Sequence, residues 1–174
     1  MSSILKVDQI QTTAGAAPTA KDLGLNVTGN TLNHYYVTAS TQTTLNSSAG
    51  NYFDIGLSKA VTPVSASSKF YIEYNVLFYG GLVTGGWLAA GGRILRDSTA
   101  IKTDSYSLGR GGYYVYSNSG TIVMFNTHDG FLDSPSTTSS ITYKAQFGNY
   151  QSGYPMYANQ GGQQGFLKIT EIEG

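Results

Sequence analysis

Residues 69–79 read KFYIEYNVLFY, and large apolar side chains recur in this stretch at every second position. Successive side chains of a β-strand point to opposite faces. One face is therefore apolar throughout and carries Phe70, Ile72, Tyr74, Val76 and Phe78. The opposite face is half-polar and carries Tyr71, Glu73, Asn75, Leu77 and Tyr79. One buried and one mixed face are typical of a strand that covers a core on one side only. The stretch predicts a strand of a β-sandwich.

Outward from this strand, the same alternation recurs in short runs separated by Gly, Ser, Asn and Pro, and no amphipathic helical pattern exceeds two turns. The runs predict further strands at residues 32–39, 52–57, 87–96, 112–117, 121–127, 141–147 and 166–172. Eight strands in about 140 residues fit an all-β, jelly-roll-like β-sandwich. In residues 121–127, Ile122 and Met124 fall on one side and Val123 and Phe125 on the other. We expect this strand to be covered twice, and a subunit interface would supply the second cover.

Glycines are concentrated between Gly80 and Gly92, where six occur in 13 residues. Glycine is unfavourable inside a strand and useful where a loop needs a positive φ or where backbones approach closely. We therefore expect a loop here, with a bulged entry into the following strand.

A change in composition near residue 31 divides the chain in two. All 14 tyrosines, 7 phenylalanines and the single tryptophan lie at Tyr35 or later. Residues 1–31 are thus predicted to form an extended N-terminal arm, and residues 32–174 the sandwich. Ordering a residue costs about 1–2 kcal/mol of backbone entropy, which the few apolar side chains of the arm cannot offset. A partner is expected to order it. The candidate anchoring side chains are Ile4, Leu5, Val7, Ile10, Leu23 and Leu25.

Charge and composition narrow the function classes. Only 11% of the residues are charged, and 10 basic residues balance 10 acidic ones. This balance argues against a nucleic-acid binder or a polybasic membrane-surface binder. The absence of cysteine excludes disulfides, thiolate metal sites and cysteine nucleophiles. No basic leader with an apolar stretch opens the chain, and no apolar run is long enough to insert into a membrane, so a soluble protein is expected.

The search for catalytic or metal-binding chemistry favours a protein that is not an enzyme and has no cofactor. No nucleophile elbow, zincin, P-loop or dinucleotide motif is present. Asp54 and Glu73 are the only acids inside well-formed predicted strands, and nothing pairs them across a cleft. His128-Asp129, with Asp133 nearby, is expected to form a solvated turn rather than a metal site. His34 is expected to be a hydrogen-bonded histidine of an interface or of the core.

Tyrosine is the clearest surplus. One group contains Tyr113, Tyr114 and Tyr116; a second lies in a loop-rich run and contains Tyr150, Tyr154 and Tyr157. Tyrosine suits both subunit interfaces and stacking against sugar rings. Closure of the sandwich and of a subunit interface is the favoured interpretation, and glycan stacking is the alternative. Trp87, flanked by glycines, is the best single candidate for a stacking platform, with a core position as its alternative.

Several segments in a fixed order resemble bacteriophage fibre and virion-surface proteins. Residues 3–15 (SILKVDQIQTTAG) and 18–29 (PTAKDLGLNVTG) are similar to the N-terminal attachment segments of those proteins. Residues 52–76, 91–101, 131–147 and 165–174 are similar to their β-sandwich modules. The matched segments cover about half of the chain.

This resemblance implies a jelly-roll-like module, similar in architecture to tumour-necrosis-factor-type domains, that assembles as a homotrimer. It implies attachment through the arm to other virion proteins, either capsid or tail subunits, and a place on the virion surface after synthesis in the host cytoplasm. It supplies no catalytic residues. A capsid decoration or short head-mounted spike is expected, because the chain has an arm and one module but no shaft. The alternative is a tail fibre or receptor-binding protein that recognises host-surface carbohydrate.

Overall fold

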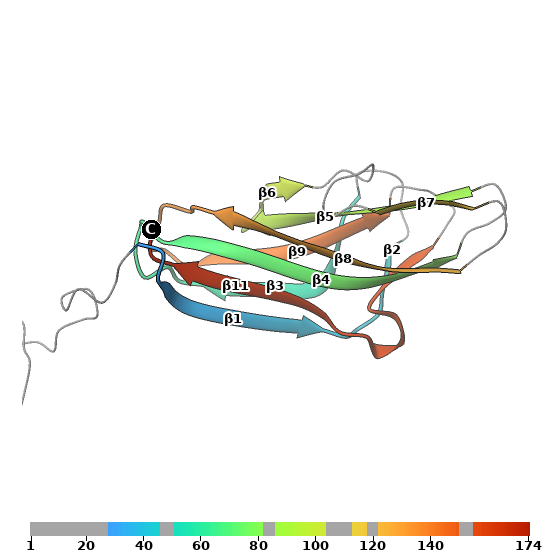
Figure 1. The fold of residues 1–174 in the computed structure, drawn as a ribbon, viewed down its shortest axis with the longest axis horizontal. Coiled ribbons are helices and arrows are strands. Elements are labelled where there is room, and N and C mark those ends of the chain that lie inside the picture. Colours follow the sequence, from blue (N-terminus) through green and yellow to red (C-terminus); the bar gives the residue numbers. More distant parts are fainter. Residues whose placement is uncertain (1–27, 46–50, 82–85, 104–112, 118–121, 150–154) are drawn as a thin grey trace, which may run out of the picture.

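The computed structural model describes residues 28–45, 51–81, 86–103, 113–117, 122–149 and 155–174, and these residues form two antiparallel sheets whose strands run along the long axis of the molecule (Figure 1). One short 3-10 turn, η1 (Gln160–Gly162), is the helical element of this part of the chain. The all-β prediction is confirmed. The strands are β1 (Thr31–Ala39), β2 (Thr43–Leu45), β3 (Phe53–Val61), β4 (Lys69–Gly81), β5 (Gly86–Arg96), β6 (Thr99–Thr103), β7 (Tyr113–Ser117), β8 (Ile122–Asp133), β9 (Ile141–Asn149), β10 (Met156–Ala158) and β11 (Gly165–Ile172).

Sheet A is organised around β4. One edge of β4 pairs with β8 along the whole of β8. The other edge pairs first with β11 and then with β10, so these two strands follow each other in one line. In the same way β1 pairs with β11, and β2 with β10. Sheet A therefore has four strand positions, in the order β8, β4, β11/β10, β1/β2.

Sheet B is organised around β5. One edge of β5 pairs with β9, and the opposite edge pairs with β6 and β7 in succession. β3 pairs with the far edge of β9. The four positions of this sheet are β3, β9, β5 and β6/β7.

The order of the strands along the chain makes this sandwich a jelly roll. We number the strand positions along the chain, so that β1/β2 is one, β3 two, β4 three, β5 four, β6/β7 five, β8 six, β9 seven and β10/β11 eight. Sheet A then contains positions one, eight, three and six, and sheet B contains two, seven, four and five. Positions one and eight, two and seven, three and six, and four and five are hydrogen-bonded neighbours. This is the pattern of one long hairpin rolled into two sheets, the double Greek key of a jelly roll. The predicted fold class is therefore confirmed.

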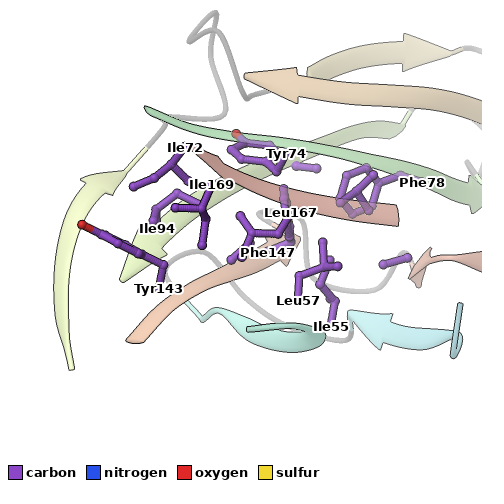
Figure 2. Packing of buried hydrophobic residues seen from close by; sticks show 14 of the residues in the cluster. Ile55, Leu57, Ile72, Tyr74, Phe78, Ile94, Tyr143, Phe147, Leu167 and Ile169 are labelled. Carbon is purple, nitrogen blue, oxygen red and sulfur yellow. The ribbon is translucent and has the colours of Figure 1, made fainter. Parts of the chain in front are cut away.

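The apolar face of β4 forms the centre of the core, as its alternation predicts. All five of its apolar side chains are at most 1% exposed. From sheet B, Phe147 meets Tyr74 edge-on at 5.2 Å and also packs against Phe78 at 5.2 Å, measured between ring centroids (Figure 2). Burial of each such side chain stabilises the fold by about 1.5–3 kcal/mol. Aromatic contacts thus join the two sheets at the centre of a core that is otherwise aliphatic.

The loop expected across Gly80–Gly92 is wrong for most of its length, because β4 continues to Gly81 and β5 begins at Gly86. Packing between the sheets requires glycine at position 92. A Cβ atom there would lie 2.8 Å from a ring carbon of Phe147 and 3.1 Å from the Tyr74 hydroxyl. The glycine makes room for the aromatic core rather than breaking the strand.

The turn expected at His128-Asp129 is also wrong, since both residues lie within β8, which continues to Asp133. His128 points outward and is exposed, whereas Asp129 points inward and is buried. Adjacent residues of a strand face opposite ways, so these two cannot share a ligand.

The expectation that Asp54 and Glu73 are the only acids in strands is wrong as well, since Asp129, Asp133 and Glu171 lie in β8 and β11. Glu171 is fully buried. Its two carboxylate oxygens accept hydrogen bonds from Asn33 Nδ2 at 2.8 Å and from the Val64 amide at 2.6 Å. These bonds compensate for burial of the carboxylate and fix the loop between β3 and β4 to the end of β11.

The beginning of the described chain is held beside its C-terminus (Figure 1). The Gly29 amide donates to the Glu173 carbonyl oxygen at 2.7 Å, and the Glu173 amide donates to the Asn30 oxygen at 2.8 Å. Residues 1–27, which contain all six candidate anchoring side chains, lie outside the described residues. The described chain therefore starts at the end of the sandwich where β1 begins and β11 ends.

Candidate interaction face

The outer faces of the two sheets differ in chemistry. Among the described residues, six large apolar side chains are exposed, and five of them lie on the outer face of sheet A: Tyr36, Tyr71, Ile122, Met124 and Leu132. The sixth, Val64, lies in the loop between β3 and β4. Exposed apolar side chains gathered on one face mark an interaction site more often than single scattered residues do. The outer face of sheet A is therefore the candidate functional site.

The least polar part of this face is a group of five residues that we call the apolar end: Leu77, Tyr79, Ile122, Met124 and Tyr157. Ile122 and Met124 of β8 are each 61% exposed. Met124 lies opposite Tyr79 of β4, and Tyr79 lies opposite Tyr157 of β10, so the three side chains form one row across three strands. Ile122 and Leu77 flank this row. The apolar end is uncharged, and Met and Tyr are residue types enriched in protein interfaces.

Charged side chains of the same face lie toward its other end. Lys168 Nζ contacts a Glu73 carboxylate oxygen at 2.8 Å, and hydrogen bonding to Glu73 raises the pKa of Lys168. Beside this pair, Tyr36 stacks on Phe166 with ring centroids 5.4 Å apart. Tyr71 and Leu132 face each other in the register of β4 and β8. The face thus grades from an uncharged end to an end with aromatic and ionic groups.

One edge of β8 borders the apolar end. Within the described part of the chain, β8 pairs with β4 alone. In that part of the chain β8 is therefore an edge strand of sheet A, and its second edge lies next to Ile122 and Met124. Natural sheets protect such edges with lysine, proline or bulges, or they use them to pair with another chain. Residues 122–126 contain no lysine or proline.

The outer face of sheet B is polar instead. Asp54 accepts hydrogen bonds from Gln146 Nε2 at 2.5 Å and from Lys144 Nζ at 3.0 Å. Gln146 in turn accepts one from Arg93 Nε at 2.7 Å, and the Arg93 guanidinium lies 4.3 Å from the centroid of the Tyr52 ring. Burial alone would raise the pKa of Asp54, but the hydrogen bonds from Gln146 and Lys144 and the nearby positive charges lower it. These polar and charged side chains suit a face that is exposed to solvent.

The candidate interface residues from the sequence are only partly placed. Tyr157 lies on the outer face of sheet A, and its ring is 6.2 Å from that of Tyr79. Trp87 lies in β5 and the three tyrosines of the first group lie in β7, with Trp87 opposite Tyr116 in the register. The side chains of these four residues, and Tyr150 and Tyr154 altogether, lie outside the described residues. Their role stays a prediction.

The sequence interpretation missed Leu77 and Tyr79 as interface candidates, although the signal was present on the half-polar face of residues 69–79. His34 lies on the outer face of sheet A, exposed, with its Nδ1 atom 3.1 Å from Thr170 Oγ1, so the core alternative for it is wrong. Within the described ranges, no three His, Asp or Glu side chains are grouped as a metal site would require. Those ranges also contain no helix long and apolar enough to cross a membrane.

Comparison with known proteins gives no family. No protein-family model matches the chain, and no curated protein matches it in sequence. Among solved structures, it is similar to structures of infectious bursal disease virus. For the Gx strain the identity is 14% and the TM-score 0.42, and for the Gt strain 12% and 0.44; in both cases all of this chain and 43% of the other are covered. For a VP2 subviral particle of the same virus, the identity is 15% and the TM-score 0.41, with 82% of this chain and 37% of the other covered. The chain spans less than half the length of these proteins, and its fold assignment rests on the strand pairing.

Proposed function

We propose that this chain is a non-enzymatic structural protein of a phage virion, a homotrimeric capsid decoration or short head-mounted spike anchored by its N-terminal arm. The observation that carries the proposal is the uncharged apolar end of sheet A, because exposed apolar side chains grouped in this way mark a surface that binds another molecule. The sequence resemblance to virion-surface proteins supports the same function.

Contact between copies of the chain accounts for the apolar end. Ile122 and Met124 lie at the margin of the sheet, on a strand that is an edge strand among the described residues. A neighbouring copy can therefore contact these exposed side chains from beside the sheet. Heterologous contacts of this kind close into a ring when the rotation between copies is suitable. Three copies would enclose the apolar ends and leave the polar faces of sheet B in solvent.

Attachment is assigned to the arm because it leaves the sandwich at the other end of the strands. Gly29 and Asn30 are bonded to Glu173, next to the start of β4, whereas Ile122 is paired with Gly81 at the end of β4. An extended arm of about thirty residues can reach up to roughly 100 Å. Three arms on one trimer would bind with avidity, since attachment of the first raises the effective concentration of the others.

Purified particles of the virus that encodes the chain provide the test. Mass spectrometry should detect the chain in the particles, and cryo-electron microscopy should locate it in many copies at capsid symmetry axes. Copies confined to the tail would contradict a capsid decoration and support the alternative. Absence from the particles would contradict both.

The alternative, a receptor-binding protein for host-surface carbohydrate, is favoured by one feature of sheet B. Tyr52, Arg93, Gln146 and Asp54 combine an aromatic ring with donors and acceptors on an outer face. Sugars are bound by such combinations of stacking and hydrogen bonding. Binding to a glycan array that Arg93→Ala abolishes, with assembly unchanged, would establish this function.

A further inference from the structure

Two ion pairs connect β8 to sheet B along the side of the sandwich where the edges of the two sheets meet. Arg96 of β5 forms one of these pairs, with its Nη1 atom 2.9 Å from Asp133 Oδ2. Further along, the Lys102 ammonium group of β6 contacts the carboxylate of Asp129. The second pair is the more buried, because the side chain of Asp129 is only 5% exposed and that of Lys102 only 21%.

The Lys102–Asp129 pair lies beside two aromatic side chains, Phe131 and Tyr74. The Lys102 Nζ atom lies 5.6 Å from the centroid of the Phe131 ring. Tyr74, which is 1% exposed, is the register partner of Asp129 on the neighbouring strand. Cross-strand partners carry their side chains next to each other on the same face. Asp129 Oδ1 accepts a hydrogen bond from the Gly130 amide at 2.7 Å. Asp129 Oδ2 is buried and accepts no hydrogen bond from the described residues, so Lys102 is its partner.

This environment changes the chemistry open to the pair. Charges are costly in low dielectric surroundings, and a proton transfer from ammonium to carboxylate removes both charges at once. The products are a neutral amine, which is a nucleophile, and a neutral carboxylic acid, which is an electrophile. An Arg–Asp pair such as Arg96–Asp133 lacks this option because a guanidinium does not lose its proton in proteins. The exposed pair Lys144–Asp54 lacks the burial, since the side chain of Asp54 is 55% exposed.

We propose that Lys102 and Asp129 form an intramolecular isopeptide bond that joins β6 to β8 and thereby sheet B to sheet A. The ammonium first transfers one proton to the carboxylate. The nitrogen lone pair then attacks Asp129 Cγ and forms the new C–N bond. The C–O bond to the protonated oxygen breaks, and the hydroxyl leaves with a second proton from the nitrogen. The products are one secondary amide and one water molecule, so the ion pair itself supplies every atom and proton.

Positioning makes this reaction feasible without an external catalyst. Groups held in contact in a fixed geometry can behave as though present at an effective concentration of about 10⁵–10⁸ M. Here the fold holds the amine against the carboxylate between two packed sheets. The bond would form once, after folding, and would prevent β8 from separating from sheet B. This inference does not depend on the proposed virion function.

Intact mass spectrometry of the purified full chain under denaturing conditions tests the proposal. The wild-type mass should lie below the sequence mass by one water molecule. Lys102→Arg keeps the charge but removes the nucleophile, so its mass should equal its own sequence mass. Lys144→Arg, at the exposed pair with Asp54, is the matched control and should retain the loss of water. A wild-type mass equal to the sequence mass would overturn the proposal, whether or not any variant folds.

One other reaction loses the same mass, because Asp129 precedes Gly130 and an Asp-Gly sequence can cyclise to a succinimide. Digestion with trypsin separates the two outcomes. The isopeptide gives a branched peptide in which residues 97–110, uncleaved at Lys102, are joined to residues 111–144. A succinimide gives linear peptides, is cleaved by hydroxylamine and persists in Lys102→Arg. Linear peptides would overturn the proposal.

Discussion

The rings of Tyr79 and Tyr157 lie 6.2 Å apart on neighbouring strands of sheet A, and both belong to the uncharged row that ends at Met124. The two tyrosines come from distant parts of the chain, and the jelly-roll order of the strands brings them together. Their position on the outer face, not in the core, makes the row available to a second copy of the chain.

Met124→Glu should dissociate the assembly into monomers. The substitution places a charge at the centre of the proposed contact, and burying an unpaired charge costs several kcal/mol. The folded subunit should be unaffected because Met124 is 61% exposed. Size-exclusion chromatography with light scattering would report the mass, and circular dichroism the fold. Ser58→Glu, on the exposed outer face of sheet B, is the control and should leave the assembly intact. Equal masses for both variants would count against the apolar end as the contact.

Tyr143→Phe should reduce the free energy of unfolding by about 1–3 kcal/mol, since it leaves a partly buried carboxylate with one donor fewer. The Tyr143 hydroxyl donates to Asp133 Oδ2 at 2.6 Å, and burial together with this bond raises the pKa of the tyrosine. Urea denaturation measures the change. Tyr36→Phe, at an exposed tyrosine, should change the stability by less than about 0.5 kcal/mol. A loss no larger at Tyr143 than at Tyr36 would show that the bond contributes nothing.

Asp54 should make the stability depend on pH in the acid range. Its pKa is lowered in the folded state, so its contribution is fully present above the ordinary aspartate pKa of about 4 and is lost as the pH falls through the lower folded value. Lys144→Met removes one hydrogen bond and one charge and should raise the pKa of Asp54. Titration of the side-chain carboxyl by NMR gives the value directly. An unchanged pKa in the variant would contradict the role of Lys144.

Gly148→Ala should destabilise the fold by about 1–3 kcal/mol, the usual effect of overpacking. A Cβ atom at position 148 would overlap the backbone oxygen of Asn51, which crosses over β9 at that point. Gly81→Ala is the matched control, because a Cβ there meets no atom within 4 Å. Thermal or urea unfolding of the two variants should differ clearly, and equal stabilities would mean that residue 51 moves aside without cost.

The core strand could be predicted from sequence because its alternation is uninterrupted from Phe70 to Phe78. The strand ends could not, for two physical reasons. Gly92 of β5 leaves room for the ring of its cross-strand neighbour Phe147 in β9, a tertiary contact that no local pattern encodes. Asp129 sits in a strand because Lys102 compensates its charge, and that partner is 27 residues away along the chain, so the local sequence His-Asp-Gly resembled a turn.

The sequence indicated that an aromatic and apolar interface exists, but it did not indicate which residues form it. A surplus of tyrosine indicated an interface, and Ile122 and Met124 indicated a strand covered on both sides. Which tyrosines share a face depends on the order of strands in the sheet. Tyr79 and Tyr157 meet only because β10 pairs with β4, a long-range pairing that composition and periodicity do not contain.

Sedimentation equilibrium of residues 28–174 measures the stoichiometry of the sandwich alone, because the truncation removes residues 1–27 and leaves the apolar end. We expect a trimer, with a mass three times that of the truncated chain, for wild type and for Ser58→Glu, and a monomer for Met124→Glu. A monomeric wild-type sandwich at micromolar concentration would contradict the proposed trimer.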